Sequence, residues 1–463
     1  MNRSQAVFPG YMAIKVKKEH IDEIKGLLEK DDLGGIERLF SELHPSGIGR
    51  VLMTLEEQEA VEVFKRLKPE LASEVLLEVD ERLRKTLMAS ISPKKLLEVL
   101  DGMETDDAAD VISELPVKDA RQVLDGLGRK ESIEVQKLLV YPEDTAGGKM
   151  QAELVSILED ATVEETIEAV RDKAGKIENI SNVFVVDFMN RLTGVVSLDK
   201  LILALPSTPI KNIADKDPVK VRTDLDQEEV AKIFKDYDLL SVPVVDHEGR
   251  LAGRITVDDI VDVLEDELFE DFYKMAGLNL EERVLDRPLR SIWMRAPWLL
   301  INLATAFLAA SVVGIFEATI EKLVILAVLM PVVAGMGGNA ATQTITIVVR
   351  GLALGELSLK NARWVIIKEA LVGVANGLLT GCAAMAASYL LGANLMVGVI
   401  LFLAMTANLL IAGLSGAFIP IVLKWLKIDP AISATVFVTT CTDIGGFFSF
   451  LGLATLFIKM GLL

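Results

Sequence analysis

One carboxylate stands in the middle of the last long apolar run of this 463-residue chain. Asp443 lies in the stretch TTCTDIGGFFSF, within the run 431–458, which is long enough to cross a lipid bilayer. At about 1.5 Å per helical residue, its side chain is roughly 18 Å from the start of the run. Lys, Arg and His are absent at the matching depth of the other apolar runs. An acid in this position typically marks the path of an ion or a substrate.

A metal cation is the simplest partner for Asp443. Two-fold dimers are the commonest homo-oligomers, and a dimer would bring a second copy of the carboxylate to the axis. Two carboxylates that face each other suit a divalent ion. Two other interpretations stay open: Asp443 titrates in a proton- or sodium-coupled transporter, or it only hydrogen-bonds a neighbouring helix.

The second apolar run combines glycines with polar side chains. In MPVVAGMGGNAATQTITIVVRG, Pro331 and three glycines precede the carboxamides of Asn339 and Gln343. Packing of membrane helices through small residues is the simpler explanation. Polar and irregular segments at membrane depth are otherwise tolerated where they line a water-filled cavity. The combination therefore predicts a pore-lining segment, with Asn339 and Gln343 beside the pore.

Five apolar runs follow residue 290, at about 296–316, 323–349, 364–391, 395–423 and 431–458. Basic residues precede the first run and occupy the connections after the second and fourth, whereas the other two connections are acidic or uncharged. Because basic connections stay in the cytosol, we expect five spans with the N-terminus inside and the C-terminus outside. The first residues lack the apolar core of a signal peptide. The expected location is the cell membrane.

The charges of the chain are distributed unevenly. Residues 286–463 carry 7 acidic and 11 basic residues out of totals of 67 and 48, so residues 1–285 are strongly acidic. Nucleic acid binding needs Lys and Arg on the phosphates, so it is not expected, and an acidic surface suits cationic partners. The sequence contains no paired nucleophile and base, no phosphate-binding glycine loop and no metal-spaced histidine cluster. An enzyme is therefore not indicated.

Acidic residues crowd the stretch DDIVDVLEDELFEDFYK, which has no basic residue before Lys274. Several of its carboxylates stand four residues apart, a spacing that costs a helix a few tenths of a kcal/mol per pair. A solvated linker is the simpler interpretation of such a run. However, this segment approaches a membrane whose cytosolic leaflet is itself negative. We therefore predict a contact that depends on divalent cations.

Two further patterns organise the soluble half. Residues 183–202 repeat at 242–261, and each copy indicates strand, turn, strand and a helix capped by Ser197 or Thr256, as in a tandem CBS pair. Such pairs often bind adenine nucleotides, and no residue here decides for or against that ligand. Residues 19–140 contain short amphipathic segments at helical spacing, which predict a stack of helices. One of these segments, ETDDAAD, places Asp106 and Asp110 on one helical face.

The stretch PVVAGMGGNAATQTITIVVRGLALGEL, the tandem repeat, the acidic connecting segment and TTCTDIGG occur together in the chain. In these features it closely resembles the MgtE family of magnesium channels over nearly its whole length. The resemblance implies a multidomain fold, with an α-helical superhelical N-terminal domain, an α+β tandem CBS pair, an acidic connecting (plug) helix and a five-helix transmembrane domain. We expect these parts at 1–142, 143–265, 266–288 and 289–463.

The resemblance also implies a homodimer whose pore, at the two-fold axis, binds hydrated Mg²⁺ at Asp443. Mg²⁺ keeps several waters and is usually held by one or two carboxylates, which agrees with this interpretation. Cytosolic Mg²⁺ would close the pore by binding between the acidic domains and the plug helix, and ATP would bind in the CBS cleft. The alternative is an ion-coupled secondary transporter of divalent cations. The implied regulatory positions are Asp226, Glu228, Asp238, Asp259, Asp262, Glu267, Glu270 and Asp271, together with Asp106 and Asp110.

Overall fold

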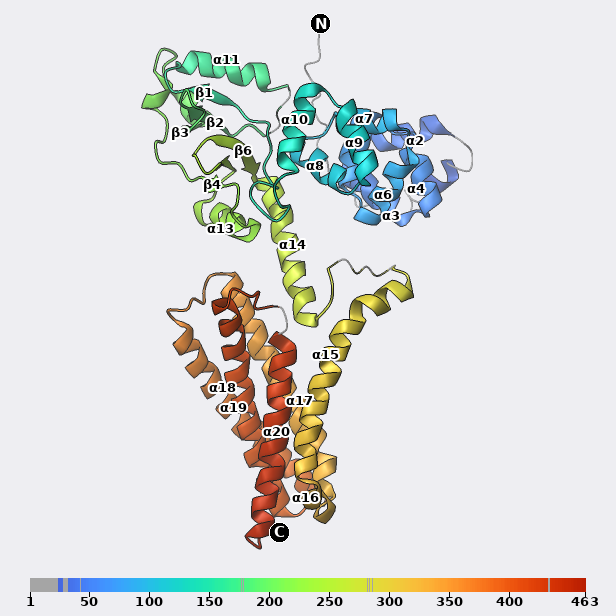
Figure 1. Ribbon diagram of the computed structural model, residues 1–463, viewed down its shortest axis with the longest axis vertical. Helices are drawn as coiled ribbons and strands as arrows, with labels where there is room; N and C mark the ends of the chain where they lie inside the picture. Colours follow the sequence, from blue (N-terminus) through green and yellow to red (C-terminus); the bar gives the residue numbers. More distant parts are fainter. Residues whose placement is uncertain are drawn as a thin grey trace. The chain divides into compact units, whose positions relative to one another are not determined.

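The computed structural model describes residues 24–27, 32–41, 43–175, 177, 179–280, 282, 284, 286–431 and 434–463. They form two compact units that are divided between Leu264 and Glu265. The first unit contains a helical domain and two small sheets, and the second contains the long apolar helices (Figure 1). The expected multidomain fold class is confirmed.

The helical domain is a series of short amphipathic helices. Pro45, Pro69 and Pro93 each stand in the first turn of a helix, where the missing N–H costs no hydrogen bond. Each helix buries a narrow apolar stripe, as α3 does with Val51 and Leu52. The helices are α2 (Leu33–Ser41), α3 (Pro45–Thr54), α4 (Glu57–Phe64), α5 (Pro69–Leu77), α6 (Glu81–Ser90), α7 (Pro93–Leu100), α8 (Thr105–Ser113), α9 (Val117–Gly126) and α10 (Arg129–Leu138).

The sequence repeat folds as two matching sheets, with strand orders β1-β2-β3 and β4-β5-β6. In each sheet an antiparallel hairpin pairs with a short parallel strand, which the sequence did not predict. The elements are β1 (Ser156–Leu158), α11 (Val163–Lys173), β2 (Asn182–Val186), β3 (Leu192–Ser197) and α12 (Leu198–Leu203), then η1 (Ile210–Asn212), β4 (Val221–Arg222), α13 (Gln227–Tyr237), β5 (Ser241–Val245), β6 (Leu251–Thr256) and α14 (Val257–Ala276).

The two following helices begin directly after Ser197 and Thr256, as expected, but the side-chain cap expected from Ser197 is wrong. Ser197 stands at the N-cap of α12, but its side chain makes no cap hydrogen bond. At the start of α14 the acceptor is Asp259, whose Oδ2 receives hydrogen bonds from the N–H (3.1 Å) and Oγ1 (2.6 Å) of Thr256. The carboxylate of Asp259, in the first turn of α14, therefore binds the residue that precedes the helix.

The second unit contains five helices that are long and apolar enough to cross a membrane, among the described residues. They are α15 (Pro288–Ile315), α17 (Ile325–Ala353), α18 (Ala362–Leu390), α19 (Leu395–Trp425) and α20 (Ala434–Lys459), and the short α16 (Glu317–Lys322) lies in a connection where no helix was predicted.

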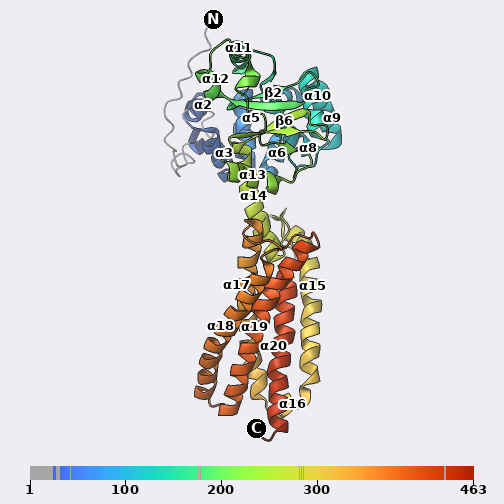
Figure 2. The same ribbon diagram turned by 90° about the vertical axis from the view of Figure 1, so that its left-hand side faces the viewer.

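Helix α19 is the most buried of these spans and packs between its neighbours (Figure 2). Gly373, Gly377 and Gly381 of α18 recur every four residues and face the backbone of α19, where an added Cβ would lie 2.4–2.9 Å from α19 atoms. Glycines at this spacing let two membrane helices approach closely. On the other side, α17 and α20 also pack against α19.

Candidate cation sites

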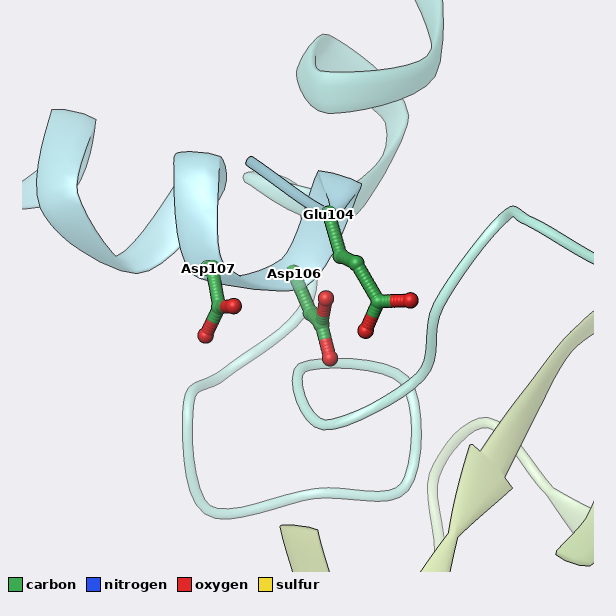
Figure 3. Close-up of side chains that lie close together, drawn as sticks. All are labelled: Glu104, Asp106 and Asp107. Carbon is green, nitrogen blue, oxygen red and sulfur yellow. The ribbon is translucent and has the colours of Figure 1, made fainter. Parts of the chain in front are cut away.

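Three carboxylates gather at the start of α8. Glu104 is the N-cap residue, and Asp106 and Asp107 lie in the first turn. One oxygen of each carboxylate lies within 4.8 Å of those of the other two. Figure 3 shows the three side chains projecting from the same side of the helix start. The positive end of the helix dipole favours negative charge there.

Two other segments of the first unit approach this cluster. Gln151 Nε2 donates to Glu104 Oε2 (2.7 Å) and to Asp259 Oδ2 (3.3 Å), so a single amide connects α8 with the start of α14. Thr105 Oγ1 donates to Glu153 Oε2 at 2.7 Å. The helical domain and the second CBS repeat therefore meet at an acidic contact, which we call the acidic cluster: Glu104, Asp106, Asp107 and Asp259.

The carboxyl groups of the acidic cluster have raised pKa values. Burial, followed by the charge of Asp259, raises the pKa of Glu104 to about 8 and the pKa of Asp107 to about 7. The same two causes raise the pKa of Asp106 well above its usual value, and burial raises the pKa of Asp259 despite its hydrogen bonds from Thr256. Desolvation and like charges both disfavour the ionised form.

The oxygen atoms of the cluster are suitable ligands for a hard cation. Asp106 is 7% exposed and Gln151 is 1% exposed, yet Asp106 Oδ1 and Gln151 Oε1 lack a hydrogen-bond donor in the described part of the chain. Buried acceptors without a donor are costly. Carboxylate and amide oxygens are the ligands that Mg²⁺ and Ca²⁺ prefer. A divalent cation would satisfy the free oxygens and neutralise the repulsion together.

The raised pKa values predict how the contact responds to pH when divalent ions are absent. Because the assembled groups hold their protons more tightly, their stabilisation is complete below the ordinary values of 4.5 and 3.8. It is lost as the pH rises through about 7 and 8. In EDTA we expect amide hydrogen exchange in α8, corrected for the intrinsic pH effect, to be faster at pH 8.5 than at pH 6. Excess Mg²⁺ should remove the difference, and equal protection in EDTA at both pH values would contradict the assignment.

The other predicted positions of the first unit are more scattered. Asp110 lies near the cluster but faces Lys149, whose Nζ is 3.7 Å from Asp110 Oδ2. Asp262 is exposed, and its negative charge contributes to the raised pKa values of Asp107 and Glu78. Asp226 caps the start of α13 with a hydrogen bond from the N–H of Glu228, while Asp238 ends the same helix in the left-handed conformation. The structure therefore does not bring Asp226 and Asp238 together.

The second half of α14 belongs to the second unit and carries Glu267, Glu270 and Asp271. Lys274 forms ion pairs with Glu270 and with Asp429, where its Nζ lies 2.6 Å from Asp429 Oδ2. The backbone carbonyl of Met275 accepts a hydrogen bond from Thr435 Oγ1 at 2.9 Å. The end of α14 is thus fastened to the connection between α19 and α20 by a cation of the chain itself.

We expect Lys274→Met to loosen this end of α14. A partly exposed ion pair contributes up to about 1 kcal/mol, which corresponds to about a fivefold change in local opening. Hydrogen exchange of residues 270–276 should therefore accelerate severalfold at low Mg²⁺. Lys459→Met, at the exposed end of α20, is the control that should leave exchange in α14 unchanged. Unaltered exchange in Lys274→Met would show that this lysine does not hold the helix.

In the membrane helices, Asp443 is half-buried on α20. Among the described residues, no Lys, Arg or His nitrogen lies within 4 Å of its carboxylate. The hydroxyls of the neighbouring Thr439 and Thr440 donate hydrogen bonds to backbone carbonyls of α20 itself. The carboxylate therefore has no cationic partner in the described part of the chain.

Helix α17 leaves one polar face uncovered. Val333, Gly337 and Ala341 are buried against neighbouring helices. Asn339 and Gln343 lie on the opposite side, and their carboxamides make no hydrogen bond within the described residues. The exposed polar face consists of Gly335, Asn339, Thr342, Gln343 and Thr346.

Two buried polar residues in the spans were not predicted. Glu369 of α18 is 3% exposed and accepts hydrogen bonds from Lys368 Nζ (2.7 Å) and Thr344 Oγ1 (3.3 Å). Asn408 of α19 is fully buried, and its Nδ2 donates to the carbonyl of Val333 at 2.9 Å. Both residues hold α17 from its buried side.

Comparison with known proteins relates the whole arrangement to one family. The family description "Divalent cation transporter" (MgtE) matches residues 330–453, "MgtE intracellular N domain" matches 43–144, and "CBS domain" matches 147–207 and 210–266. The chain is 36% identical over 330 residues to a magnesium transporter MgtE of Enterococcus faecalis, covering 71% of this chain and 73% of the relative. It is 39% identical over 329 residues to one of Thermus thermophilus, covering 70% and 73%.

A solved structure is also similar to the first part of the chain. A crystal structure described as the cytosolic domain of the Mg²⁺ channel MgtE in complex with ATP is 36% identical, with a TM-score of 0.50. It covers 52% of this chain and 99% of that chain. Identity at this level over about 70% of the chain, together with family descriptions that match the soluble domains and residues 330–453, shows that the chain belongs to the MgtE family of magnesium transporters.

Proposed function

We propose that the chain is a Mg²⁺-selective channel for import across the cell membrane, with Asp443 as the ion-binding residue of the pore. The observation that carries the proposal is the uncovered face of α17, where the exposed carboxamides of Asn339 and Gln343 have no hydrogen-bond partner among the described residues. Lipid offers such groups no hydrogen bonds. The face therefore belongs against water or against a second copy of the chain.

A homodimer satisfies both requirements. In a two-fold dimer the same surface of each protomer meets its copy, so two polar faces and two Asp443 carboxylates would surround one axis. Water between them would hydrate the carboxamides. Mg²⁺ would remain hydrated and would be held by the negative charge of two carboxylates through its waters.

We propose further that internal Mg²⁺ closes this pore by binding at the acidic cluster and along α14. A ligand shifts an equilibrium only by its preference for one state. The acidic cluster supplies that preference, because its carboxylates, of which Asp106 is buried and the others partly buried, lie together where Gln151 connects α8 with the start of α14. Mg²⁺ that neutralises them stabilises this contact over the separated domains.

Influx of Mg²⁺ into proteoliposomes tests both parts. The liposomes contain a Mg²⁺-sensitive dye, and Mg²⁺ is set low or high on the side of the soluble domains. Flux that falls at high Mg²⁺ supports the pore and its closure, while flux that stays constant contradicts the closure. Flux that requires an imposed proton or sodium gradient would favour the coupled transporter instead.

ATP is a second ligand that we propose for the CBS pair. The support is the similarity to the ATP complex of an MgtE cytosolic domain and the paired β-hairpins of the two repeats. Titration of the full chain with ATP, followed by hydrogen exchange, should protect residues of the CBS repeats. Exchange that is insensitive to millimolar ATP would remove the nucleotide from the proposal.

A further inference from the structure

We propose that Asn408 is a positioning residue of the pore: its carboxamide is a wedge that fixes the separation of α17 and α20. This inference rests on the proposed pore, because α17 carries Asn339 and α20 carries Asp443. It concerns a residue of α19 that lies behind the proposed pore, and its contacts come from the buried side of both helices.

The carboxamide lies in a notch between two glycines. A Cβ added at Gly337 of α17 would meet Asn408 Nδ2 at 2.2 Å and Cγ at 2.9 Å. A Cβ added at Gly446 of α20 would meet the same two atoms at 2.6 and 2.9 Å. For both glycines the three nearest atoms all belong to the Asn408 carboxamide. One planar group therefore contacts both helices where each has no side chain.

The Asn408 carboxamide makes a hydrogen bond through its nitrogen but not through its oxygen. Asn408 Nδ2 donates to the carbonyl of Val333, which lies one turn before Gly337 on α17. Its Oδ1 is buried and has no donor in the described part of the chain. An apolar side chain of this size would fill the notch without leaving an acceptor unpaired. Filling space alone therefore does not account for an amide at this position. Its hydrogen bond to the carbonyl of Val333, which joins α19 to α17, does.

The wedge acts close to the proposed ion path. Gly446 follows Asp443 by three residues, so it lies about one helical turn further along α20. Gly337 precedes Asn339 by two residues on α17. A change in the thickness of the wedge therefore moves the Asp443 carboxylate relative to the carboxamides of α17. An outer partner that orients a metal ligand typically changes metal affinity by about 10–100-fold.

The test compares wedge and notch variants of the full chain in proteoliposomes. The measured quantity is the external Mg²⁺ concentration at half-maximal influx, kept separate from the maximal influx per folded protein. Asn408→Ala, which thins the wedge, and Gly446→Ala, which collides with it, are each expected to raise this concentration about tenfold. The double variant Asn408→Ala/Gly446→Ala replaces the lost carboxamide by a methyl group and is expected to return it toward the wild-type value.

Two substitutions serve as matched controls. Ser415→Ala removes a hydroxyl of α19 that bonds only to carbonyls of its own helix. Gly452→Ala adds a methyl group to α20, where the nearest atom outside its own helix, Phe316 Cζ, is 3.9 Å away. Both should leave the half-maximal concentration unchanged.

The outcomes separate the wedge from a purely structural role and from failure of the pore. Single variants that lower only the maximal influx, or a double variant whose defects add, would overturn the positioning role. If Asp443→Asn itself leaves influx unchanged, the proposed pore fails first. Normal half-maximal concentrations in both single variants, together with a defective Asp443→Asn, would overturn the wedge alone.

Discussion

Replacing Asp443 by Asn is expected to reduce Mg²⁺ influx at least about tenfold, since even outer partners of metal ligands cost 10–100-fold when lost. Asn keeps the shape of the side chain and removes its charge. Asp443 is half-buried on α20, and no cationic side chain approaches it within the described residues. The expected loss is therefore a loss of attraction for the ion and not of a structural ion pair.

The control for this prediction is Glu356→Gln, which removes one exposed negative charge outside the membrane helices. It should leave influx unchanged, while size-exclusion chromatography confirms that both variants remain folded. Influx should be measured with the pH equal on both sides and again with an imposed gradient. An Asp443→Asn variant with the influx of the wild type would disprove the pore site. Influx that follows the proton gradient in the wild type but not in Asp443→Asn would identify Asp443 as a titrating group.

The membrane helices were the most predictable part of the fold. Bilayer thickness sets the length of an apolar run, so five runs gave five helices with ends displaced by a few residues. The exception is α15, which begins at Pro288, because a segment that contains Arg290 and Arg295 continues the helix before the apolar residues. The short α16 was missed because six residues carry no clear periodicity.

The acidic cluster was predictable only in part. Asp106 and Asp259 were expected to bind cations, and the structure brings both into one contact. Glu104 and Gln151 were missed, because nothing local connects a residue before α8 with one that is 47 positions later. Asp226 and Asp238 were also expected to bind cations, but they stand at the two ends of α13. Asp226 is its N-cap residue and Asp238 its C-cap residue. Charge density therefore predicts an acidic surface, but tertiary contacts decide which carboxylates lie together.

The polar residues on the buried side of α17 leave a weaker signal in the sequence. Asn408 is one amide within an apolar run, and Glu369 directly follows a lysine that could have placed both at the membrane surface. In the sequence, a glycine packed against a neighbouring helix, such as Gly337, cannot be distinguished from one with open space beside it, such as Gly338. The notch around Asn408 needs three helices, so only the fold reveals it.

The triple variant Asp106→Asn/Asp107→Asn/Asp259→Asn is expected to weaken closure by internal Mg²⁺. A ligand that binds two states equally shifts neither, and without these charges Mg²⁺ loses its preference for the assembled contact. The internal Mg²⁺ concentration at half-closure should rise at least about tenfold, while influx at low internal Mg²⁺ stays near that of the wild type. The measurement is influx into proteoliposomes over a series of internal Mg²⁺ concentrations.

The matched control is Asp101→Asn/Asp119→Asn/Asp125→Asn, which removes three exposed charges from the same helical domain. It should close as the wild type does, because these carboxylates are exposed and lie outside the acidic cluster. Normal closure in the cluster variant would place the sensor elsewhere, with α14 as the remaining acidic segment. A cluster variant that is closed at every Mg²⁺ concentration would instead show that repulsion among these carboxylates holds the pore open, and that neutralisation by any means is the closing step.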